Sequence, residues 1–481
     1  MTPADNPAPW PSDRDLLEAL HPWMEARRWF PLKGDAAPAA AAADLAIGVD
    51  RVLAPNVRDL LIAAPRAGAD PVLIHVPLVL DEADALDSFA VEGESEGAHG
   101  LLLKSAPGLA LVDGPHHPDF WRAWARAAAE AGTVLGDGGA EAIAQRAGTG
   151  TVMTGEQSNT NVVMRAPEGA TLPDLVVKLF RVLAPGRNPD VEVSAALASD
   201  GWDRVRRPVA WSMLSWSDPA TGAELVSDSA VACTFIPKAD DGFELFCDLA
   251  STDDGPTGEV RSRAVDLARD LGATTAQMHA HMAAALGTAE PVAPAELADF
   301  LRRRAQWAMD EVAFLAERMP DMREKVEEVL SRLEGLDALE PACRIHGDYH
   351  LGQVLREKDA PDGAVERWFV LDFEGEPLRP LAERSMPDQP MRDVAGMLRS
   401  FDYAAAVGRA NDSTWLADMR AAFLGGYAAE RPGVGAEDAE RERVLVAALE
   451  LDKALYEAVY EARNRPAWIS IPLRAIEALL S

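Results

Sequence analysis

Residues 346–355 read HGDYHLGQVL and residues 370–377 read VLDFEGEP, and these two stretches decide the fold. Both crowd ionisable groups into a few positions: His346, Asp348 and His350 in the first, Asp372, Glu374 and Glu376 in the second. Each lies beside an apolar run that is typical of a short strand. A metal site, a hydrolytic acid/base pair and a phosphoryl-transfer site all remain open at this point.

The bulk composition limits the choice. The chain has 481 residues, of which 48% are hydrophobic and 26% charged, which indicates a soluble globular protein of two or three domains. The formal net charge of −32 argues against nucleic acid or an anionic membrane as the main partner, although a locally basic pocket for phosphate is compatible with it. We expect a small-molecule partner and a monomer or weak homodimer.

The sequence also indicates where in the cell the protein is expected. The N-terminus lacks a basic region followed by an apolar run, and no window approaches the length of an uncharged membrane span. The three cysteines form no CxxC pair and predict no disulfide framework. We therefore expect a cytoplasmic protein.

The order of patterns along the chain predicts a bilobal α+β protein with an N-terminal cap subdomain. Short apolar runs between turns predict a sheet-rich module at 45–115. We predict a cap at 1–135, a mixed strand and helix N-lobe at 136–240, and a mainly helical C-lobe at 241–481. Helical spacing predicts the C-lobe helices at 259–286, 292–318, 320–337, 390–408, 413–429 and 436–463.

A polar turn at 155–161, GEQSNTN, separates two strand-like runs. Such turns leave backbone N–H groups that can cradle phosphate oxygens, although an ordinary hairpin loop explains the same residues. The candidate phosphate-binding residues here are Gly155, Gln157, Ser158 and Asn159.

Lys178 lies inside the strand-like run VVKLF, where it either points to solvent or needs an anionic partner. Glu192, on the next predicted helix, is the expected partner. A strand lysine paired with a helix glutamate positions nucleotide phosphates in kinase-like folds.

The spacing of HGDYHLGQVL matches a kinase catalytic loop. Asp348 precedes Gln353 by five residues, as the proton-accepting aspartate precedes a metal-binding amide in that loop. Asp372 follows the run WFVL and corresponds to the metal-binding aspartate of a DFG-type loop. Glu374 replaces the glycine of that motif and adds a second carboxylate, which is compatible with Mg²⁺.

Three other readings compete. His346 and His350 have a known zinc-ligand spacing, but Gly347 and Gly352 favour a loop over the helix this would need. Two aspartates could form a glycosidase pair, but Lys178 and its partner would then be unused. Two solvated turns are the simplest alternative.

Taken together, six segments resemble actinobacterial maltokinases and glucosamine kinases, which are related to aminoglycoside phosphotransferases and have a eukaryotic-protein-kinase-like fold. The segments are HGDYHLGQ, LDFEGEP, GEQSNTN, VKLFR…PGRNPDVE, RDVAGMLRSFDYAA and YEAVYEARNRPAWISIPL. The cap reads RRWFPLKGD from residue 27, whereas maltokinases usually read RWFGGKGR there. This departure favours the glucosamine kinase branch.

The resemblance implies ATP and Mg²⁺ as cofactors and assigns a role to each motif. Asp348 would deprotonate the sugar hydroxyl, and Gln353 and Asp372 would hold Mg²⁺, with Glu374 beside them. Lys178, braced by Glu192, would hold phosphates under the 155–161 turn. The backbone around Thr234 and Ile236 would meet adenine.

The acceptor sugar is expected against YEAVYEARNRPAW, in which Glu457 and Glu461 share a helix face. A solvated helix that ends at Pro466 explains the same pattern. The candidate sugar-binding residues are His350, Glu457, Tyr460, Glu461, Asn464 and Trp468. We expect glucosamine 6-phosphate as the product; the alternatives are maltose 1-phosphate and a nucleotide-binding pseudokinase.

Overall fold

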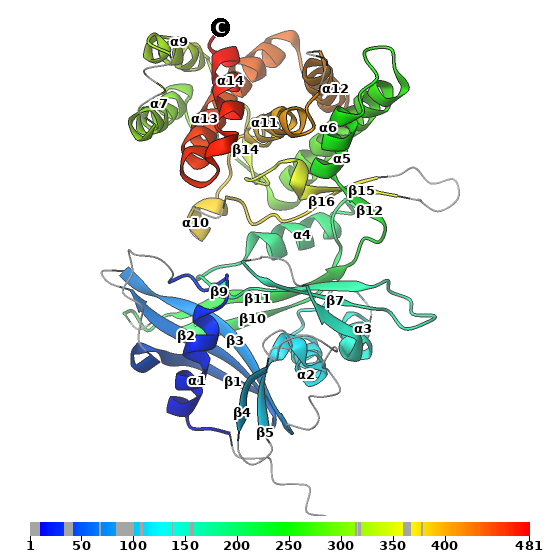
Figure 1. Cartoon of the computed structure of the whole chain (residues 1–481), viewed down its shortest axis with the longest axis vertical. Coiled ribbons are helices and arrows are strands. Elements are labelled where there is room, and N and C mark those ends of the chain that lie inside the picture. Colours follow the sequence, from blue (N-terminus) through cyan, green and yellow to red (C-terminus); the bar gives the residue numbers. More distant parts are fainter. Residues whose placement is uncertain are drawn as a thin grey trace, which may run out of the picture. The chain divides into compact units, whose positions relative to one another are not determined.

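The chain divides into two compact units, which are described separately below (Figure 1). Unit 1 comprises residues 1–195 and 206–236, and unit 2 comprises residues 196–205 and 237–481. The computed structural model describes residues 10–32, 42–66, 69–82, 101–105, 109–136, 138–153, 158–218, 220–312, 315, 319–358, 367–376, 379–410, 412 and 414–481.

The first sheet of unit 1 is antiparallel, with the strand order β1-β2-β3-β5-β4 and β9 paired to β3. Helix α1 (Asp13–Glu25) begins at the Ser12 cap and buries Leu16, Leu20 and Met24 in a core shared with strand residues such as Ile62 and Ile74. The strands are β1 (Ala46–Ala54), β2 (Val57–Arg66), β3 (Ala69–Glu82), β4 (Leu101–Ser105), β5 (Leu109–Asp113) and β9 (Val182–Leu183).

The second sheet of unit 1 has the strand order β10-β11-β8-β7-β6. Trp121 and Trp124 of α2 (Pro118–Glu130) are buried in its core. The strands are β6 (Gly150–Val152), β7 (Thr160–Met164), β8 (Leu175–Leu179), β10 (Pro208–Ser217) and β11 (Glu224–Thr234); α3 is Gly139–Arg146 and α4 is Pro189–Ser199.

A buried arginine ties the two sheets of unit 1 together. Arg181, between β8 and β9, forms hydrogen bonds of 3.0 and 2.5 Å to both carboxylate oxygens of Asp113 on β5. Its Nε donates to Thr160 Oγ1 at 2.8 Å, and its guanidinium stacks over Trp29 at 5.0 Å. Both charges are almost fully buried. The cap strands can therefore pack on the strand that carries Lys178 only when these two charges are paired.

Unit 2 is mainly helical. Helices α6 and α12 pack side by side, and α11 packs on α13 (Figure 1). The helices are α5 (Gly242–Ser251), α6 (Glu259–Leu286), α7 (Pro294–Glu311), α9 (Met322–Glu334), α10 (Leu381–Arg384), α11 (Met391–Val407), α12 (Trp415–Ala429), α13 (Ala436–Asn464) and α14 (Ser470–Leu479).

Two small sheets interrupt these helices. Strands β12 (Ala239–Asp241), β15 (Val354–Glu357) and β16 (Trp368–Val370) form one, in that order, and β13 (Thr288–Ala289) pairs with β14 (Ala342–Cys343) in the other. The short strands flank the two motifs with which the sequence analysis began.

The predicted α+β, kinase-like fold is confirmed, and each of the six helices predicted for the C-lobe overlaps a helix of the structure. The division into 1–135, 136–240 and 241–481 stays a prediction; by their contacts, the cap strands and the strands of the predicted N-lobe belong to one unit. Within the described part of the chain, every helix is too short or too polar to cross a membrane.

The Arg181–Asp113 pair gives a first prediction. Asp113→Ala leaves a buried guanidinium without its carboxylate, so the free energy of unfolding of unit 1 should fall by about 3–5 kcal/mol. Urea unfolding followed by circular dichroism measures this. The control is Glu18→Ala, which breaks an exposed helix pair with Arg14 and should leave the midpoint unchanged. Equal, small shifts for both variants would contradict a structural role for Arg181.

Candidate active site

A short antiparallel pairing brings the two ionisable motifs together. Val354 of β15 pairs with Val370 of β16, and the Leu371 N–H donates to the Gln353 carbonyl at 2.9 Å. Because the strands run in opposite directions, the residues before β15 and after β16 meet at one end of the hairpin. The loops HGDYHLGQ and DFEGE therefore form a single site.

His346 fixes the first loop against the second. Its Nε2–H donates to the Leu371 carbonyl at 2.8 Å, and its Nδ1 accepts from the Asp348 N–H at 3.3 Å. Both ring nitrogens are thus engaged within the two loops, so the ring holds the backbone of Asp348 in place.

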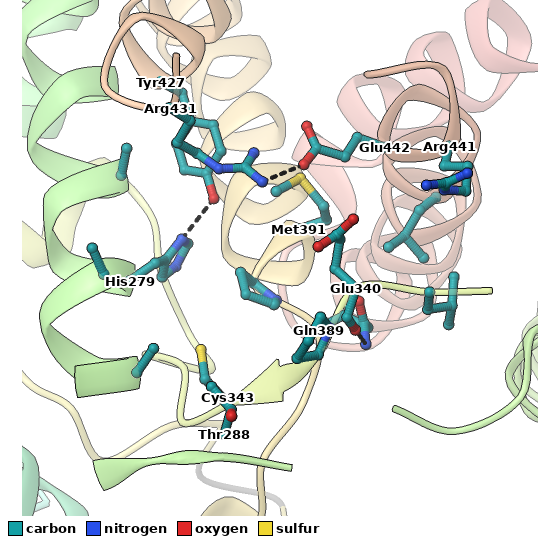
Figure 2. A pocket seen from close by; sticks show the side chains of 17 residues that line it. His279, Thr288, Glu340, Cys343, Gln389, Met391, Tyr427, Arg431, Arg441 and Glu442 are labelled. Carbon is teal, nitrogen blue, oxygen red and sulfur yellow. Dashed lines mark hydrogen bonds and ion pairs between the residues drawn. The ribbon is translucent and has the colours of Figure 1, made fainter. Parts of the chain in front are cut away.

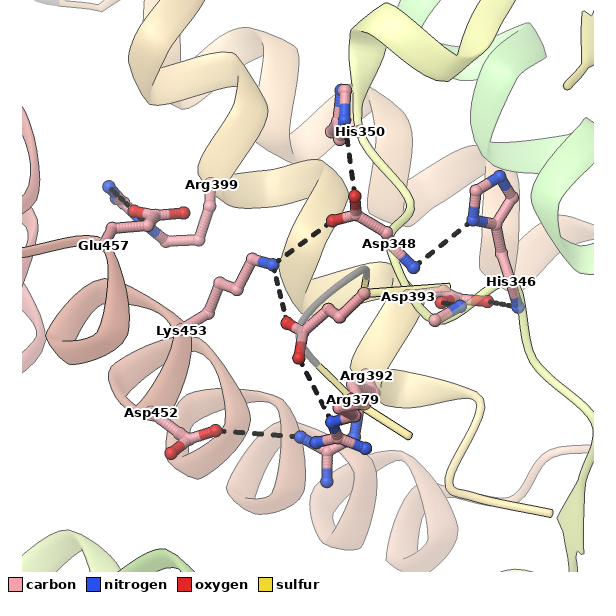
Figure 3. Close-up of polar contacts among 12 residues, drawn as sticks. His346, Asp348, His350, Arg379, Arg392, Asp393, Arg399, Asp452, Lys453 and Glu457 are labelled. Carbon is pink, nitrogen blue, oxygen red and sulfur yellow. Dashed lines mark hydrogen bonds and ion pairs between the residues drawn. The ribbon is translucent and has the colours of Figure 1, made fainter. Parts of the chain in front are cut away.

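Asp393, in the first turn of α11, holds the same loop from the helical core (Figure 3). Its carboxylate accepts from the backbone N–H groups of His346 at 2.7 Å and Gly347 at 2.9 Å, and lies 3.1 Å from His279 Nε2. Burial opposes ionisation, but these contacts hold the pKa of Asp393 below its ordinary value. Asp393 was not predicted from the sequence; the available signal was an acidic residue beside the apolar ones in RDVAG.

Left-handed backbone conformations mark the meeting point of the loops. Gly347 and Gly375 have φ of 82° and 72°, and a Cβ on Gly347 would lie 3.3 Å from the Gly375 Cα. The glycines allow this approach. Asp372 also has a positive φ, 61°, which is a strained conformation for a residue with a side chain and is frequent at functional sites.

Asp348 lies beside a lysine that the sequence analysis did not single out (Figure 3). Lys453 Nζ, from α13, is 3.5 Å from Asp348 Oδ1 and 3.0 Å from Glu376 Oε1. His350 Nε2 lies 4.0 Å from the other oxygen, Asp348 Oδ2, while His350 Nδ1 accepts from the Gly352 N–H. Asp348 is thus oriented by two side chains and keeps partial access to solvent.

The charges of this cluster stabilise one another. Burial disfavours the cation of Lys453, but Glu376 and Asp348 raise its pKa above the ordinary value. Burial likewise disfavours ionised Glu376, but Lys453 and Arg379 hold its pKa below the usual range. Both groups are therefore charged at neutral pH.

Three oxygen-bearing side chains gather at the same end of the hairpin. Gln353 Nε2 lies 3.4 Å from Asp372 Oδ2, and a carboxylate oxygen of Asp372 lies within 4.8 Å of one from Glu374. Rotation of the Gln353 amide would present its oxygen in place of its nitrogen. Carboxylate and amide oxygens suit a hard cation, so the predicted Mg²⁺ ligands fit the ion in number and kind.

A cavity of about 730 Å³ opens in front of Asp348. Its lining includes five of the six predicted sugar-binding residues: His350, Glu457, Tyr460, Glu461 and Trp468. The structure does not bring Asn464 into this wall, because its Nδ2 donates to the Tyr460 carbonyl within the helix at 2.9 Å. Lys453, Tyr403 and Glu376 line the cavity as well and were not predicted.

Acidic groups dominate the wall of this cavity. Six lining residues carry carboxylates, namely Asp241, Glu244, Asp348, Glu376, Glu457 and Glu461, whereas Lys453 and Arg465 carry the permanent positive charges of the lining. Glu457 accepts from the Arg399 guanidinium at 2.8 Å, and Glu461 from Tyr403 at 3.0 Å and Arg465 at 2.6 Å. Burial raises the pKa of Glu457, although Arg399 opposes the shift.

The predicted nucleotide residues lie in unit 1. Lys178 Nζ is 3.0 Å from Asp190 Oδ2, a carboxylate that was not predicted and that lies on α4 two residues before the predicted partner, Glu192. Asn159 Oδ1 accepts from the Arg181 N–H at 3.4 Å. The pairing of Lys178 with Glu192 stays a prediction.

The other predicted nucleotide residues are only partly described. Ser158 lies in the bend before β7, and Gly155 and Gln157 lie outside the described residues. Thr234 ends β11, with its N–H donating to the Arg207 carbonyl at 2.9 Å, and Ile236 is buried two residues later. The roles of all these residues stay predictions.

A second cavity, of about 200 Å³, lies behind the catalytic loop among α6, α11, α12 and α13 (Figure 2). His279 lines it and links Tyr427, at 3.0 Å, to Asp393. Arg431 and Glu442 form an ion pair across its far side. Its walls are mostly apolar, and none of the candidate site residues that the structure describes lines it. The cavity therefore lies beside the groups that hold Asp393 and is separate from the Asp348 site.

The fold and site define a class of protein. A family model described as the phosphotransferase enzyme family matches residues 150–433, more than half of the chain. The chain belongs to this family and is a phosphotransferase. The match includes Lys178, Asp348 and Asp372 and ends before α13, which supplies much of the cavity wall.

Three glucosamine kinases are similar to this chain. A glucosamine kinase from Streptacidiphilus jiangxiensis is 29% identical over 349 residues, which are 68% of this chain and 74% of that protein. One from Mycolicibacterium smegmatis (strain ATCC 700084 / mc(2)155) is 30% identical over 317 residues, 63% and 75% of the two chains. A solved glucosamine kinase in complex with glucosamine, ADP and inorganic phosphate has a TM-score of 0.62 at 22% identity, covering 98% of this chain and 100% of that chain.

The Asp393 anchor gives a second prediction. In Asp393→Asn the amide keeps one acceptor oxygen, so one of the two loop N–H groups loses its partner in a buried setting. The free energy of unfolding should fall by about 1–3 kcal/mol. The value of kcat should also fall, by more than the loss of folded protein explains, because Asp348 shifts. Thermal unfolding and steady-state kinetics on the same preparation measure both. Unchanged kcat at reduced stability would contradict a role in positioning Asp348.

Proposed function

We propose that this chain is an ATP- and Mg²⁺-dependent sugar kinase that phosphorylates the 6-hydroxyl of glucosamine. The observation that supports this most is the acidic cavity in front of Asp348. A buried cation is costly unless carboxylates compensate its charge, so a wall with six carboxylates and two permanent cations favours an amino sugar over a neutral one. The two relatives that are glucosamine kinases agree with this preference.

Aromatic groups complete the acceptor site. Tyr403, Tyr460 and Trp468 line the cavity, and Tyr403 and Trp468 have ring centroids 6.1 Å apart. Apolar ring faces pack against the C–H face of a pyranose, while the surrounding carboxylates accept from its hydroxyl and ammonium groups. The site therefore offers both kinds of contact that a monosaccharide needs.

In the proposed reaction Asp348 accepts the proton of the 6-hydroxyl as O6 forms its bond to the γ-phosphorus of ATP. The bond between that phosphorus and the β,γ-bridging oxygen breaks, and ADP leaves with the electron pair. Asp348 is suited to this because His346 holds its backbone N–H and Lys453 lies beside its carboxylate. Such a reaction depends mainly on position and charge neutralisation.

Within unit 2, Gln353, Asp372 and Glu374 would hold Mg²⁺, which when bound neutralises the phosphate charge. Within unit 1, Lys178 would bind phosphate oxygens, with Asp190 fixing its ammonium group. The relative solved with ADP is consistent with a nucleotide in this fold. The presence of Lys178, Asp348 and Asp372 argues against a pseudokinase.

The choice of sugar is tested with the purified protein, ATP and Mg²⁺ in a coupled ADP-release assay. Glucosamine should give the highest kcat/KM in a panel with glucose, N-acetylglucosamine and maltose. Glucose and N-acetylglucosamine are the controls for charge, because glucose replaces the ammonium group by a neutral hydroxyl, and acetylation makes the same nitrogen a neutral, larger amide. High turnover of maltose with none of glucosamine would overturn the proposal in favour of maltose phosphorylation.

The assigned roles of the two aspartates are tested separately. Asp348→Asn removes the proton acceptor and should lower kcat by about 10²–10⁴-fold, with little change in the KM for ATP. Asp372→Asn should instead raise the Mg²⁺ concentration needed for half-maximal rate. Turnover by Asp348→Asn at the normal rate would show that another group accepts the proton.

A further inference from the structure

The side chain of Lys453 places a fixed positive charge inside the acceptor cavity, directly beside the proton acceptor. Its Nζ lies 3.5 Å from Asp348 Oδ1 and 3.0 Å from Glu376 Oε1 (Figure 3). A lysine is not needed for proton abstraction, and a cation next to the acceptor makes an electrostatically poor neighbour for a cationic substrate. The placement needs a separate explanation.

One face of α13 lines the cavity with a lysine and, further along the helix, two glutamates. Lys453, Tyr456, Glu457, Tyr460 and Glu461 line it, with the spacing that places residues on one side of a helix. At a rise of 1.5 Å per residue, Glu457 and Glu461 lie about 6 and 12 Å further along the helix axis than Lys453. This face of α13 thus places an ammonium group next to Asp348 and Glu376, and its own carboxylates lie further along the cavity.

Glucosamine is also polarised across its ring. The ring carbons that carry the amino group and the hydroxymethyl group lie opposite each other, so the charged end and the reacting hydroxyl point in opposite directions. If the ammonium group bound to Asp348, a hydrogen bond of about 2.9 Å would bring it within about 6 Å of Lys453 Nζ. The neutral hydroxyl meets no such repulsion at that position.

We propose that Lys453 is a positioning residue that selects the orientation of the acceptor by excluding a substrate ammonium group from Asp348. The inference rests on the proposed glucosamine kinase function and adds the residue that decides which end of the sugar reacts. Glu376, which also receives Arg379 at 3.1 Å, fixes the position of the lysine charge. Carboxylates elsewhere in the wall, Glu457 and Glu461 among them, accept the ammonium end.

Loss of the lysine charge should produce non-productive binding. In Lys453→Met, Asp348 and Glu376 attract the ammonium group, so glucosamine binds in the reversed orientation as well. Both kcat and KM for glucosamine should then fall together by about tenfold, the effect of two unit charges about 6 Å apart in a partly hydrated cavity. Glucose has no ammonium group, so its KM, or its inhibition constant as a competitor, should not fall.

The matched variants are Lys453→Arg and Glu376→Gln. Lys453→Arg keeps the charge and should restore the discrimination between the two sugars. Glu376→Gln keeps the lysine and removes part of its neutralisation, so the KM for glucosamine should rise while that for glucose stays. This opposite change tests the proposal even if Lys453→Met fails to fold.

Kinetics of the wild type and the three variants with glucosamine and glucose decide the question. Absence of glucosamine turnover in the wild type would refute the proposed function. If the wild type is active and each variant changes the constants for both sugars by the same factor, Lys453 is a structural residue and the orientation proposal is wrong.

Discussion

The buried carboxylate of Asp393 is the constraint on which the active site depends. It binds two consecutive backbone N–H groups of the HGD loop and contacts His279 of α6, so it fixes the loop relative to the helical core. His346 then connects that loop to the strand end before Asp372. Because these bonds act on the backbone, the positions of Asp348 and Asp372 are set before any substrate binds, as phosphoryl transfer requires.

Local spacing in the sequence predicts much of this arrangement. The five residues between Asp348 and Gln353, and the strand before Asp372, lie within short segments whose geometry is set by a loop and a hairpin. Contacts between residues far apart in the sequence were not predicted, because nothing near Asp348 in the sequence indicates Lys453 or Asp393. The surroundings of Lys178 show the same limit, since helix α4 was predicted to supply a carboxylate but Asp190, which lies 3.0 Å from the lysine, was not singled out.

In the proposed function, the chemistry and the choice of acceptor are carried by different parts of unit 2. The family-wide match covers the loops that contain Asp348 and Asp372 and ends at residue 433. Helix α13, which follows, supplies Lys453, Glu457 and Glu461 to the cavity. A shared phosphoryl-transfer centre combined with a separate helical wall allows the acceptor to change while the reaction is kept, and it makes α13 the element in which substrate preference is to be sought.

The most direct test of this account is a crystal structure of the protein with glucosamine bound. The account predicts the sugar in the cavity against α13, with its 6-hydroxyl within hydrogen-bond distance of Asp348 and its ammonium group directed away from Lys453 toward carboxylates of the wall. Glucosamine bound with its ammonium group on Asp348, or bound outside this cavity, would contradict it.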